Sequence, residues 1–306
     1  KPDQYISKDF LMFRDWILGD DYNHYLYKQI LEASGKLPYE IKDLEVSSPQ
    51  REFFQRRPPS QGPVKNVFKK AFETVGKLIP SRFNEVVFVT SFLNLKDLTR
   101  LQWDLGQLPY PTAPTVVPGD VPINWELRRQ LNFSGEKNPY EEILFNVIPQ
   151  HIPISYVEGY LDVHQKSMAA FPKHPRVIFT ATGLFGNDGF TFWAANQVER
   201  GAKLVVSQHG GHYGSSSWSA NESHELSVCD LHFSWGWDDP TQPQTIAMPS
   251  GQLAGLKPRI KPNPLGQILW VGESFPRYTC QLLSVPLSKQ ALDCFKEQQR
   301  CSYCFF

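Results

Sequence analysis

The segment that decides the fold spans residues 176–214 and reads RVIFTATGLFGNDGFTFWAANQVERGAKLVVSQHGGHYG. Val177–Thr180 and Lys203–Ser207 are short, β-branched apolar runs, which are typical of buried parallel strands. Between them, apolar residues recur at helical spacing until Gly201, a residue type that commonly ends a helix. A strand, a helix and a strand at this spacing form a βαβ unit, whose two strands are parallel. The sequence therefore predicts an α/β fold in which helices flank a Rossmann-like parallel sheet.

Three loops are expected to meet at one edge of this sheet. Residues 182–188 and 208–214 directly follow the two predicted strands. Leu231–Trp235 is a third strand-like run, so residues 236–239 would follow a third strand. In parallel α/β sheets, ligands bind at the carboxyl ends of the strands. We therefore expect the binding site of the protein in these loops.

Apolar periodicity and helix-start signals predict further elements on the N-terminal side of the βαβ unit. The first are a helix over residues 8–33, a polar linker at 46–63, an amphipathic helix at 64–78 and a strand at Val86–Thr90. A helix from Asn94 to near Gly106 and an irregular proline-rich loop at 107–125 follow. The last are a helix that starts at Asn138 and a helix at 156–168, which begins with a capping box between Ser155 and Glu158. The strand at 86–90 has the composition of a buried parallel strand, so it suits the same sheet.

The composition excludes several classes of protein. Of the 306 residues, 41% are hydrophobic and 20% are charged, which is the composition of a folded globular protein. The 31 Lys and Arg residues balance the 31 Asp and Glu residues, so the charge does not indicate a nucleic-acid partner. No apolar run approaches the ~18–20 residues that a membrane span needs. Five cysteines, a low and odd number, favour a reducing compartment, so we expect the protein in the cytoplasm.

His209 is the main candidate for catalysis, because it follows a predicted strand and precedes Gly210 and Gly211. An imidazole can accept a proton from a hydroxyl nucleophile at neutral pH. The two glycines lack Cβ atoms, so their backbone N–H groups can approach a phosphate or an oxyanion. A hydrogen-bonded loop histidine without a catalytic role would give the same pattern. The chain lacks Gly-x-Gly-x-x-Gly, Walker and Gly-x-Ser-x-Gly motifs, which disfavours classical dinucleotide binding, P-loop ATP binding and serine-hydrolase chemistry.

Two carboxylates, Asp188 and Glu158, complete the predicted catalytic set with His209. Each also has a structural explanation, since Asp188 stands where a helix N-cap would be and Glu158 would be the reciprocal partner in the capping box. For substrate binding, the loops supply the remaining candidates: Gly183, Gln208, Gly210, Gly211, His212, Tyr213, Gly214 and Trp237. A tryptophan in such a loop can stack on the face of a sugar or pack in the core.

Histidines near His209 leave a metal site open as an alternative. His212, His224 and His232 follow it within two dozen residues, as do Cys229 and Asp230. Their spacing matches no metalloprotease or zinc-finger motif, so we assign no metal. A metal-dependent hydrolase that uses His209, His212, His224 and Asp230 is nevertheless an alternative function. Cys301 and Cys304 form one Cys-x-x-Cys pair without the second pair that a structural zinc site needs.

Four motifs, taken together, resemble a known family. They lie at residues 175–180, 185–195, 201–214 and 229–237, with further matches at 20–24 and 148–160. Jointly they are similar to a family of transferases encoded in bacterial O-antigen and surface-polysaccharide loci. The similarity extends over roughly residues 10–275 and is densest at 148–237. Gly189 and Thr191 depart from it, because larger, charged residues are more usual at these positions.

The resemblance implies a fold and a base. Members of this family resemble GT-B glycosyltransferases, which have two Rossmann domains, and polyglycerolphosphate transferases, in which a His-Gly pair after a strand contains the proposed base. By position, that base is His209, and Gln267–Gly272 is the first strand of the donor-binding domain. The sequence would then be a fragment with a helical N-terminal segment and linker (1–62), a Rossmann-like acceptor-side domain (63–265) and the start of a truncated donor-binding domain (266–306).

The motifs and the resemblance together predict a glycosyltransferase-like enzyme of surface-polysaccharide synthesis. It would move a sugar or a glycerophosphate from a nucleotide-activated donor to a hydroxyl of a glycan or lipid-linked acceptor. The activated sugar is a substrate, and no further cofactor is implied. Besides the hydrolase, a carbohydrate-binding or assembly subunit with this fold and without turnover is an alternative.

Overall fold

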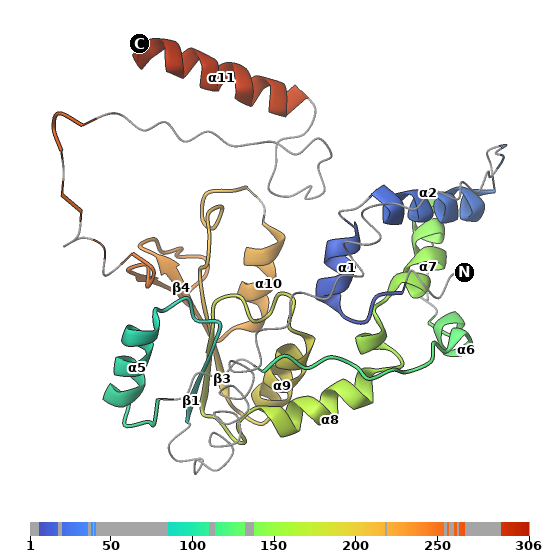
Figure 1. The fold of residues 1–306 in the computed structure, drawn as a ribbon, viewed down its shortest axis with the longest axis horizontal. Coiled ribbons are helices and arrows are strands. Elements are labelled where there is room, and N and C mark those ends of the chain that lie inside the picture. The colour runs from blue at the N-terminus through green and yellow to red at the C-terminus, as the bar shows by residue number, and fades with distance from the viewer. Residues whose placement is uncertain are drawn as a thin grey trace, which may run out of the picture. The chain divides into compact units, whose positions relative to one another are not determined.

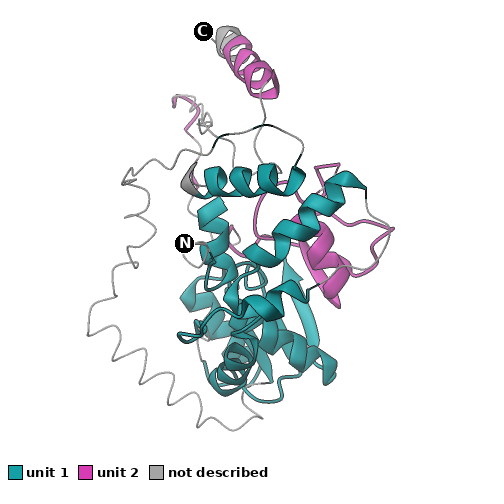
Figure 2. Cartoon of the chain, turned by 90° about the vertical axis from the view of Figure 1, so that its right-hand side faces the viewer, with its two compact units in different colours: residues 1–207 teal, residues 208–306 magenta. Residues whose placement is uncertain are grey.

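The computed structural model of the protein describes residues 6–17, 20–35, 38, 40, 85–109, 114–131, 138–217, 219–253, 256, 260–261, 263–266 and 289–305. The predicted linker at 46–63, helix at 64–78 and strand at 267–272 lie outside these residues. The chain divides into two compact units, residues 1–207 and residues 208–306 (Figure 2). The domain boundaries that the sequence suggests, after residues 62 and 265, stay predictions.

The first unit contains the predicted βαβ unit. Its strands are β1 (Val86–Val89), β2 (Val177–Thr180) and β3 (Lys203–Ser207), and α9 (Asp188–Glu199) connects the last two. All neighbouring pairs are parallel, with Val87 opposite Ile178 and Ile178 opposite Leu204. In Figure 1 these strands lie side by side, with α5 (Leu95–Asp104) and α9 on opposite sides of them. Helices on both faces explain why the strands are apolar throughout rather than alternating.

The packed face of α9 is the one that the sequence predicts. Phe190, Trp193 and Ala194 are buried inside the first unit, whereas Val198 is half-buried. The ring of Phe171 stacks on Trp193, with ring centroids 4.9 Å apart and an interplanar angle of 19°. Burial of each such aromatic side chain contributes about 2–3 kcal/mol, so this face fixes α9 against the sheet.

The remaining elements before β2 are helical. They are α1 (Phe10–Ile17), α2 (Asp20–Ser34), α6 (Trp125–Arg129), α7 (Pro139–His151), the 3-10 helix η3 (Ile154–Tyr156) and α8 (Tyr160–Ala170). The predicted helix at 8–33 is thus two helices. As predicted, α5 begins after Asn94, whose side chain accepts the N–H of Asp97 (3.0 Å), and α7 begins after Asn138. Helix α6 was not predicted, because five residues are too few for a periodic pattern.

Two predicted helix starts are wrong. The N-cap of α9 is Asn187, not Asp188, which is the first residue inside the helix. No capping box joins Ser155 and Glu158, because Ser155 lies in η3 and α8 starts only at Tyr160. Both side chains have partners far away in the sequence, and these outcompete the local capping pattern.

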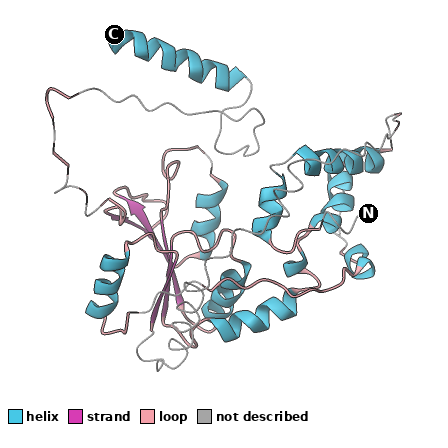
Figure 3. Cartoon of the chain, viewed as in Figure 1, coloured by secondary structure: helices cyan, strands magenta, loops and turns pink. Residues whose placement is uncertain are grey.

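The second unit continues the α/β pattern. It contains α10 (Ala220–Val228), β4 (Leu231–Trp235), β5 (Thr245–Met248) and α11 (Lys289–Phe305). β4 is the predicted third strand, and it pairs in parallel with β5, which was not predicted. The sheet order is β1-β2-β3-β4-β5, so the predicted α/β class with a parallel sheet is confirmed (Figure 3). Of the helices among the described residues, none has both the length and the apolar character that crossing a bilayer requires.

Candidate active site

The loop Gln208–Gly214 starts directly after β3, and the buried side chain of Gln208 fixes its beginning. The Oε1 atom of Gln208 accepts hydrogen bonds from the backbone N–H of Trp235 (2.8 Å) and the indole N–H of Trp237 (2.9 Å). Its Nε2 donates to the carbonyl oxygen of Gly210 (2.8 Å). One side chain therefore joins this loop to the end of β4, and two predicted binding residues, Gln208 and Trp237, lie in contact.

His209 lies beside a phenol and a carboxylate of the second unit. Its Nε2 atom is 2.7 Å from the hydroxyl of Tyr213 and 3.4 Å from Oε1 of Glu225. Its side chain is 18% exposed, so a substrate can reach part of the ring. Burial, and then the negative charge of Glu225, raise the pKa of Tyr213. The phenol therefore stays protonated at neutral pH, and its hydroxyl can donate to Nε2 of His209 or accept from it, according to the tautomer of the ring.

Glu225, on α10, lies between two imidazoles. Its Oε2 atom is 3.5 Å from Nε2 of His232, which is on β4, and the side chains of Glu225 and His232 are both 0% exposed. Neither the carboxylate oxygens nor the ring nitrogens of His232 have a formed hydrogen bond among the described residues. Tyr213 is close enough for the carboxylate charge to act on it, but the geometry is not that of a hydrogen bond. Buried polar groups without partners are rare and call for an explanation.

The glycines of the loop differ in what they do. Gly214 has φ +67°, and a Cβ there would lie 2.9 Å from the indole of Trp237, so only glycine fits. Among the residues that the structure describes, a Cβ on Gly210 or Gly211 would meet nothing within 4 Å, so there is open space beside both. The exposed His212 has φ +78°, a left-handed conformation that is uncommon outside glycine. Packing therefore explains Gly214, whereas no contact among the described residues requires a glycine at position 210 or 211.

Asp188, in the first unit, is buried and fully hydrogen-bonded. Its Oδ2 accepts the backbone N–H of Phe10 (3.1 Å) and the hydroxyl of Ser155, and its Oδ1 accepts the hydroxyl of Tyr156 (3.0 Å). Burial, and then the charge of Asp188, raise the pKa of Tyr156, so this phenol stays protonated and continues to donate. These bonds attach the start of α1 and the η3 turn to the start of α9.

Glu158, also in the first unit, forms a buried ion pair. Its two oxygens accept from Nε (2.6 Å) and Nη2 (2.7 Å) of Arg128, and Oε1 also accepts the backbone N–H of Asn124 (2.9 Å). The side chains of Arg128 and Glu158 are 1% and 3% exposed. Burial would raise the pKa of Glu158, but the bonds from Arg128 and Asn124 outweigh it and hold that pKa below its usual range. The carboxylate is therefore ionised and engaged.

A comparison with family models decides the family. The model described as the LIC12162 family transferase matches residues 1–301. The chain belongs to the LIC12162 family of transferases. Searches of the curated proteins and of the solved structures return no significant match. The matched range includes the loop after β3, α10 and β4.

Other predicted residues of this LIC12162 family member have different surroundings. Gly183 belongs to the first unit, and a Cβ there would lie 2.6 Å from Oγ1 of Thr180 and 2.7 Å from the ring of Phe190, so close packing explains this glycine. His212 and His224, from the hydrolase alternative, are exposed. Among the residues that the structure describes, no group of three or more His, Cys, Asp or Glu side chains could hold a metal ion.

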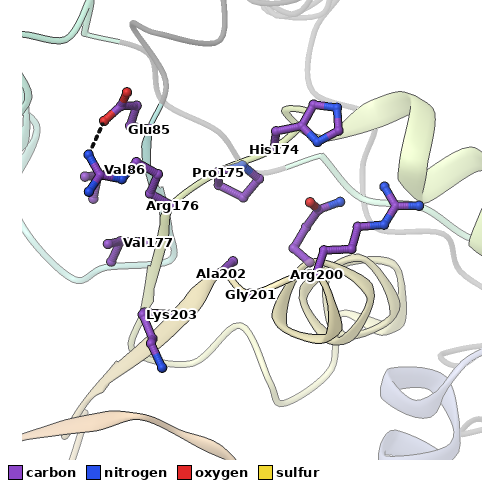
Figure 4. Close-up of a pocket in the computed structure, with 11 residues that line it drawn as sticks. Glu85, Val86, His174, Pro175, Arg176, Val177, Arg200, Gly201, Ala202 and Lys203 are labelled. Carbon is purple, nitrogen blue, oxygen red and sulfur yellow. Dashed lines mark hydrogen bonds and ion pairs between the residues drawn. The ribbon is translucent and has the colours of Figure 1, made fainter.

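A cavity of about 610 Å³ opens at the opposite, amino ends of the strands in the first unit. Figure 4 shows that the charged side chains at its wall do not converge. Arg176 turns to Glu85, with which it forms an ion pair (3.1 Å), and Arg200 and Lys203 point in different directions. The cavity therefore lacks the convergent polar groups that orient a ligand, and we assign it no role in the transferase.

Glu225 was not predicted as a functional residue from the sequence. The strand LHFSW alternates apolar and polar residues, and this pattern alone predicts that Leu231, Phe233 and Trp235 face the core. Instead, His232 and Ser234 are the fully buried residues of β4. A strand that buries its polar face needs polar partners, and the acidic residue that α10 supplies to His232 is Glu225.

Proposed function

We propose that the protein is a transferase of the GT-B type in surface-polysaccharide synthesis. It moves a sugar or a glycerophosphate from a nucleotide-activated donor to a hydroxyl of a glycan or lipid-linked acceptor. The observation that supports this best is the partly exposed His209 with the buried carboxylate of Glu225 behind it. An imidazole next to an orienting carboxylate is the arrangement that takes a proton from a hydroxyl nucleophile. Membership in a transferase family supports the reaction class.

In the proposed reaction, His209 accepts the proton of the acceptor hydroxyl. The acceptor oxygen attacks the anomeric carbon of the sugar, or the phosphorus of the glycerophosphate. The bond from that atom to a phosphate oxygen of the nucleotide breaks, and the nucleotide leaves with the electron pair. Gly210 and Gly211, with open space beside them, are suited to bring backbone N–H groups to the charge that develops on the donor.

The other parts of the proposal rest on the resemblance. We assign donor binding to the domain that begins near residue 266, and acceptor binding to the loop after β3 together with Trp237. We expect the reaction in the cytoplasm or at the inner face of its membrane. Asp188 and Glu158 support the fold in this proposal, because their carboxylates are engaged by Ser155, Tyr156 and Arg128.

The test is donor turnover by the full-length protein. It is incubated with nucleotide sugars and CDP-glycerol in the presence of an acceptor extract, and nucleotide release is followed by mass spectrometry. We expect release from one donor, and His209→Ala should lower it by about 10²–10⁴-fold because the general base is lost. His174→Ala, at an exposed histidine of the first unit, is the matched control and should leave turnover unchanged.

Three outcomes would contradict the proposal. Full activity of His209→Ala would show that His209 is not the general base. Stoichiometric zinc or manganese in the purified protein, with hydrolysis that is lost after dialysis against EDTA, would favour the hydrolase instead. Glycan binding without turnover, unaffected by His209→Ala, would favour a binding subunit.

A further inference from the structure

Within residues 208–253, few groups can compensate the charge of Glu225. Residues 208–253 contain no Lys or Arg, and their acidic residues are Glu222, Glu225, Asp230, Asp238 and Asp239. A buried carboxylate without a partner costs several kcal/mol, so folded proteins rarely keep one unless it serves a purpose. Within this stretch, the imidazoles of His209 and His232 are the groups placed to bring positive charge to the carboxylate.

Two other titratable groups beside Glu225 among the described residues, Tyr213 and Cys229, are neutral. The hydroxyl of Tyr213 keeps its proton, because burial and the carboxylate raise its pKa. Burial, and then the charge of Glu225, raise the pKa of the Cys229 thiol to about 11, so this group is also uncharged at neutral pH. Glu222, one turn earlier on α10, adds negative charge near Tyr213 and binds the N–H of Gly214 (3.1 Å). A positive charge that forms on an imidazole beside Glu225 would therefore meet a carboxylate and no competing cation from residues 208–253.

We propose that Glu225 is the positioning residue of His209 and that His232 holds Glu225, so that the three side chains act as one unit. This inference rests on the proposed function. The gap of 3.4 Å between His209 and Glu225 is longer than the ~2.7–2.9 Å of a charge-assisted hydrogen bond. When His209 takes the acceptor's proton, the imidazolium attracts the carboxylate, and a shift of about 0.5–0.7 Å forms that bond. Glu225 thus stabilises a charge that exists only during the reaction.

His232 completes the unit from the interior. It is fully buried, so it does not touch substrate, and its Nε2 faces the second oxygen of Glu225 at 3.5 Å. Its ring is stacked on the ring of Tyr213, at 5.8 Å between centroids and 13° between planes. Tyr213 in turn reaches His209 through its hydroxyl. One tyrosine therefore contacts both histidines and fixes their separation across the carboxylate.

The first test compares Glu225→Gln with Glu225→Asp in the full-length protein. Glu225→Gln keeps the shape but loses the charge, so we expect kcat to fall by about 10²-fold with KM changed less than about 2-fold. The acid limb of the pH–rate profile should move to lower pH, because the imidazolium loses its stabilising carboxylate. Glu225→Asp should regain part of the rate. Glu199→Gln, at an exposed position at the end of α9, is the matched control.

A second test separates a positioning role from a structural one and does not need the donor. A carboxylate that holds the fold would lower the melting temperature when it is lost, whereas we expect Glu225→Gln to leave Tm unchanged or raise it. In NMR spectra of ¹⁵N-labelled histidine, His209 and His232 should titrate interdependently in the natural protein and independently in Glu225→Gln.

The two proposals fail in different ways. If His209→Ala abolishes turnover but Glu225→Gln has the natural kcat and the natural acid limb, the positioning role is wrong and the transferase proposal stands. If His209→Ala is fully active, the proposed base is wrong. Independent titration of His209 and His232 in the natural protein would overturn the unit of three side chains in either case.

Discussion

Two buried glutamates have opposite surroundings in the two compact units. Glu158, in the first unit, receives three hydrogen bonds, two of them from the guanidinium of Arg128. Glu225, in the second, has two imidazoles at 3.4 and 3.5 Å and no formed hydrogen bond among the described residues. In the sequence both belong to short helical patterns, and only their three-dimensional partners distinguish them.

The different surroundings suit the two glutamates to different roles, Glu158 to stability and Glu225 to the reaction. A carboxylate whose oxygens are all engaged lowers the energy of the fold and has no lone pair to offer to a reaction. A carboxylate that is buried beside titratable groups raises the energy of the fold, and the same contact becomes favourable when a neighbour gains a proton. The same substitution, Glu to Gln, should therefore give opposite results at the two positions.

The largest expected effect on stability is that of Glu158→Gln. It leaves the buried guanidinium of Arg128 without its counter-charge, which costs about 3–5 kcal/mol of unfolding free energy. Urea unfolding followed by tryptophan fluorescence measures this loss, and Glu126→Gln, an exposed change on α6, should stay within about 0.5 kcal/mol. If Glu158→Gln lost less unfolding free energy than Glu225→Gln, the proposed difference between the two glutamates would be wrong.

The next largest effect is a pH dependence of the unfolding free energy, which arises from His151 on α7. Its ring is buried between the hydroxyl of Tyr22 and the amide of Gln29, and burial, followed by the charge of Arg128, lowers its pKa from 6.5 to about 4. Between these values the unfolded chain binds more protons than the folded chain, so stability falls as the pH falls. The loss is about 2 kcal/mol between pH 6.5 and 5.

Unfolding curves at several pH values measure this slope. His151→Gln should remove it in the range from about pH 6.5 to 5, above the ordinary pKa values of carboxylates. His174→Gln, at an exposed histidine, should leave it unchanged. An unchanged slope in His151→Gln would show that another group is responsible.

The smallest effect is expected for Asp188→Asn. The amide keeps one accepting oxygen, but its NH₂ group cannot accept the hydrogen bonds that Oδ2 receives from Phe10 and Ser155. We expect a loss of about 1–2 kcal/mol, measured by urea unfolding, with turnover unchanged in the donor assay. If turnover instead falls by about 10²-fold or more without loss of stability, Asp188 is a catalytic residue after all. Asp104→Asn, an exposed change on α5, is the control.

The sequence predicted the elements whose signals are local. β1 to β4 are contiguous runs with strand propensity, and the packed face of α9 follows from helical spacing. β5 was missed because three of its four residues are exposed, so it has no buried run to detect. The capping box at Ser155 and Glu158 failed because their partners, Asp188 and Arg128, are 33 and 30 residues away.

The site was predicted in part for the same reason. The loop that contains His209 is recognisable because it follows a strong strand and contains paired glycines. Glu225 and His232 are less visible, since a polar residue in a helix or strand is usually solvated. Their burial results from the packing of α10 against β4, and no local pattern encodes that packing.

The hydrogen bonds that attach residues 7–10 to the rest of the first unit also have a consequence during synthesis. The carbonyls of Ser7 and Lys8 accept the N–H groups of Ile154 and Ser155, and the N–H of Phe10 donates to Asp188, 178 residues later. A ribosome that adds about 5–20 residues per second needs roughly 10–35 s to reach that aspartate. During this interval α1 can pack only on its neighbour α2, and its attachment to α9 has to wait for Asp188.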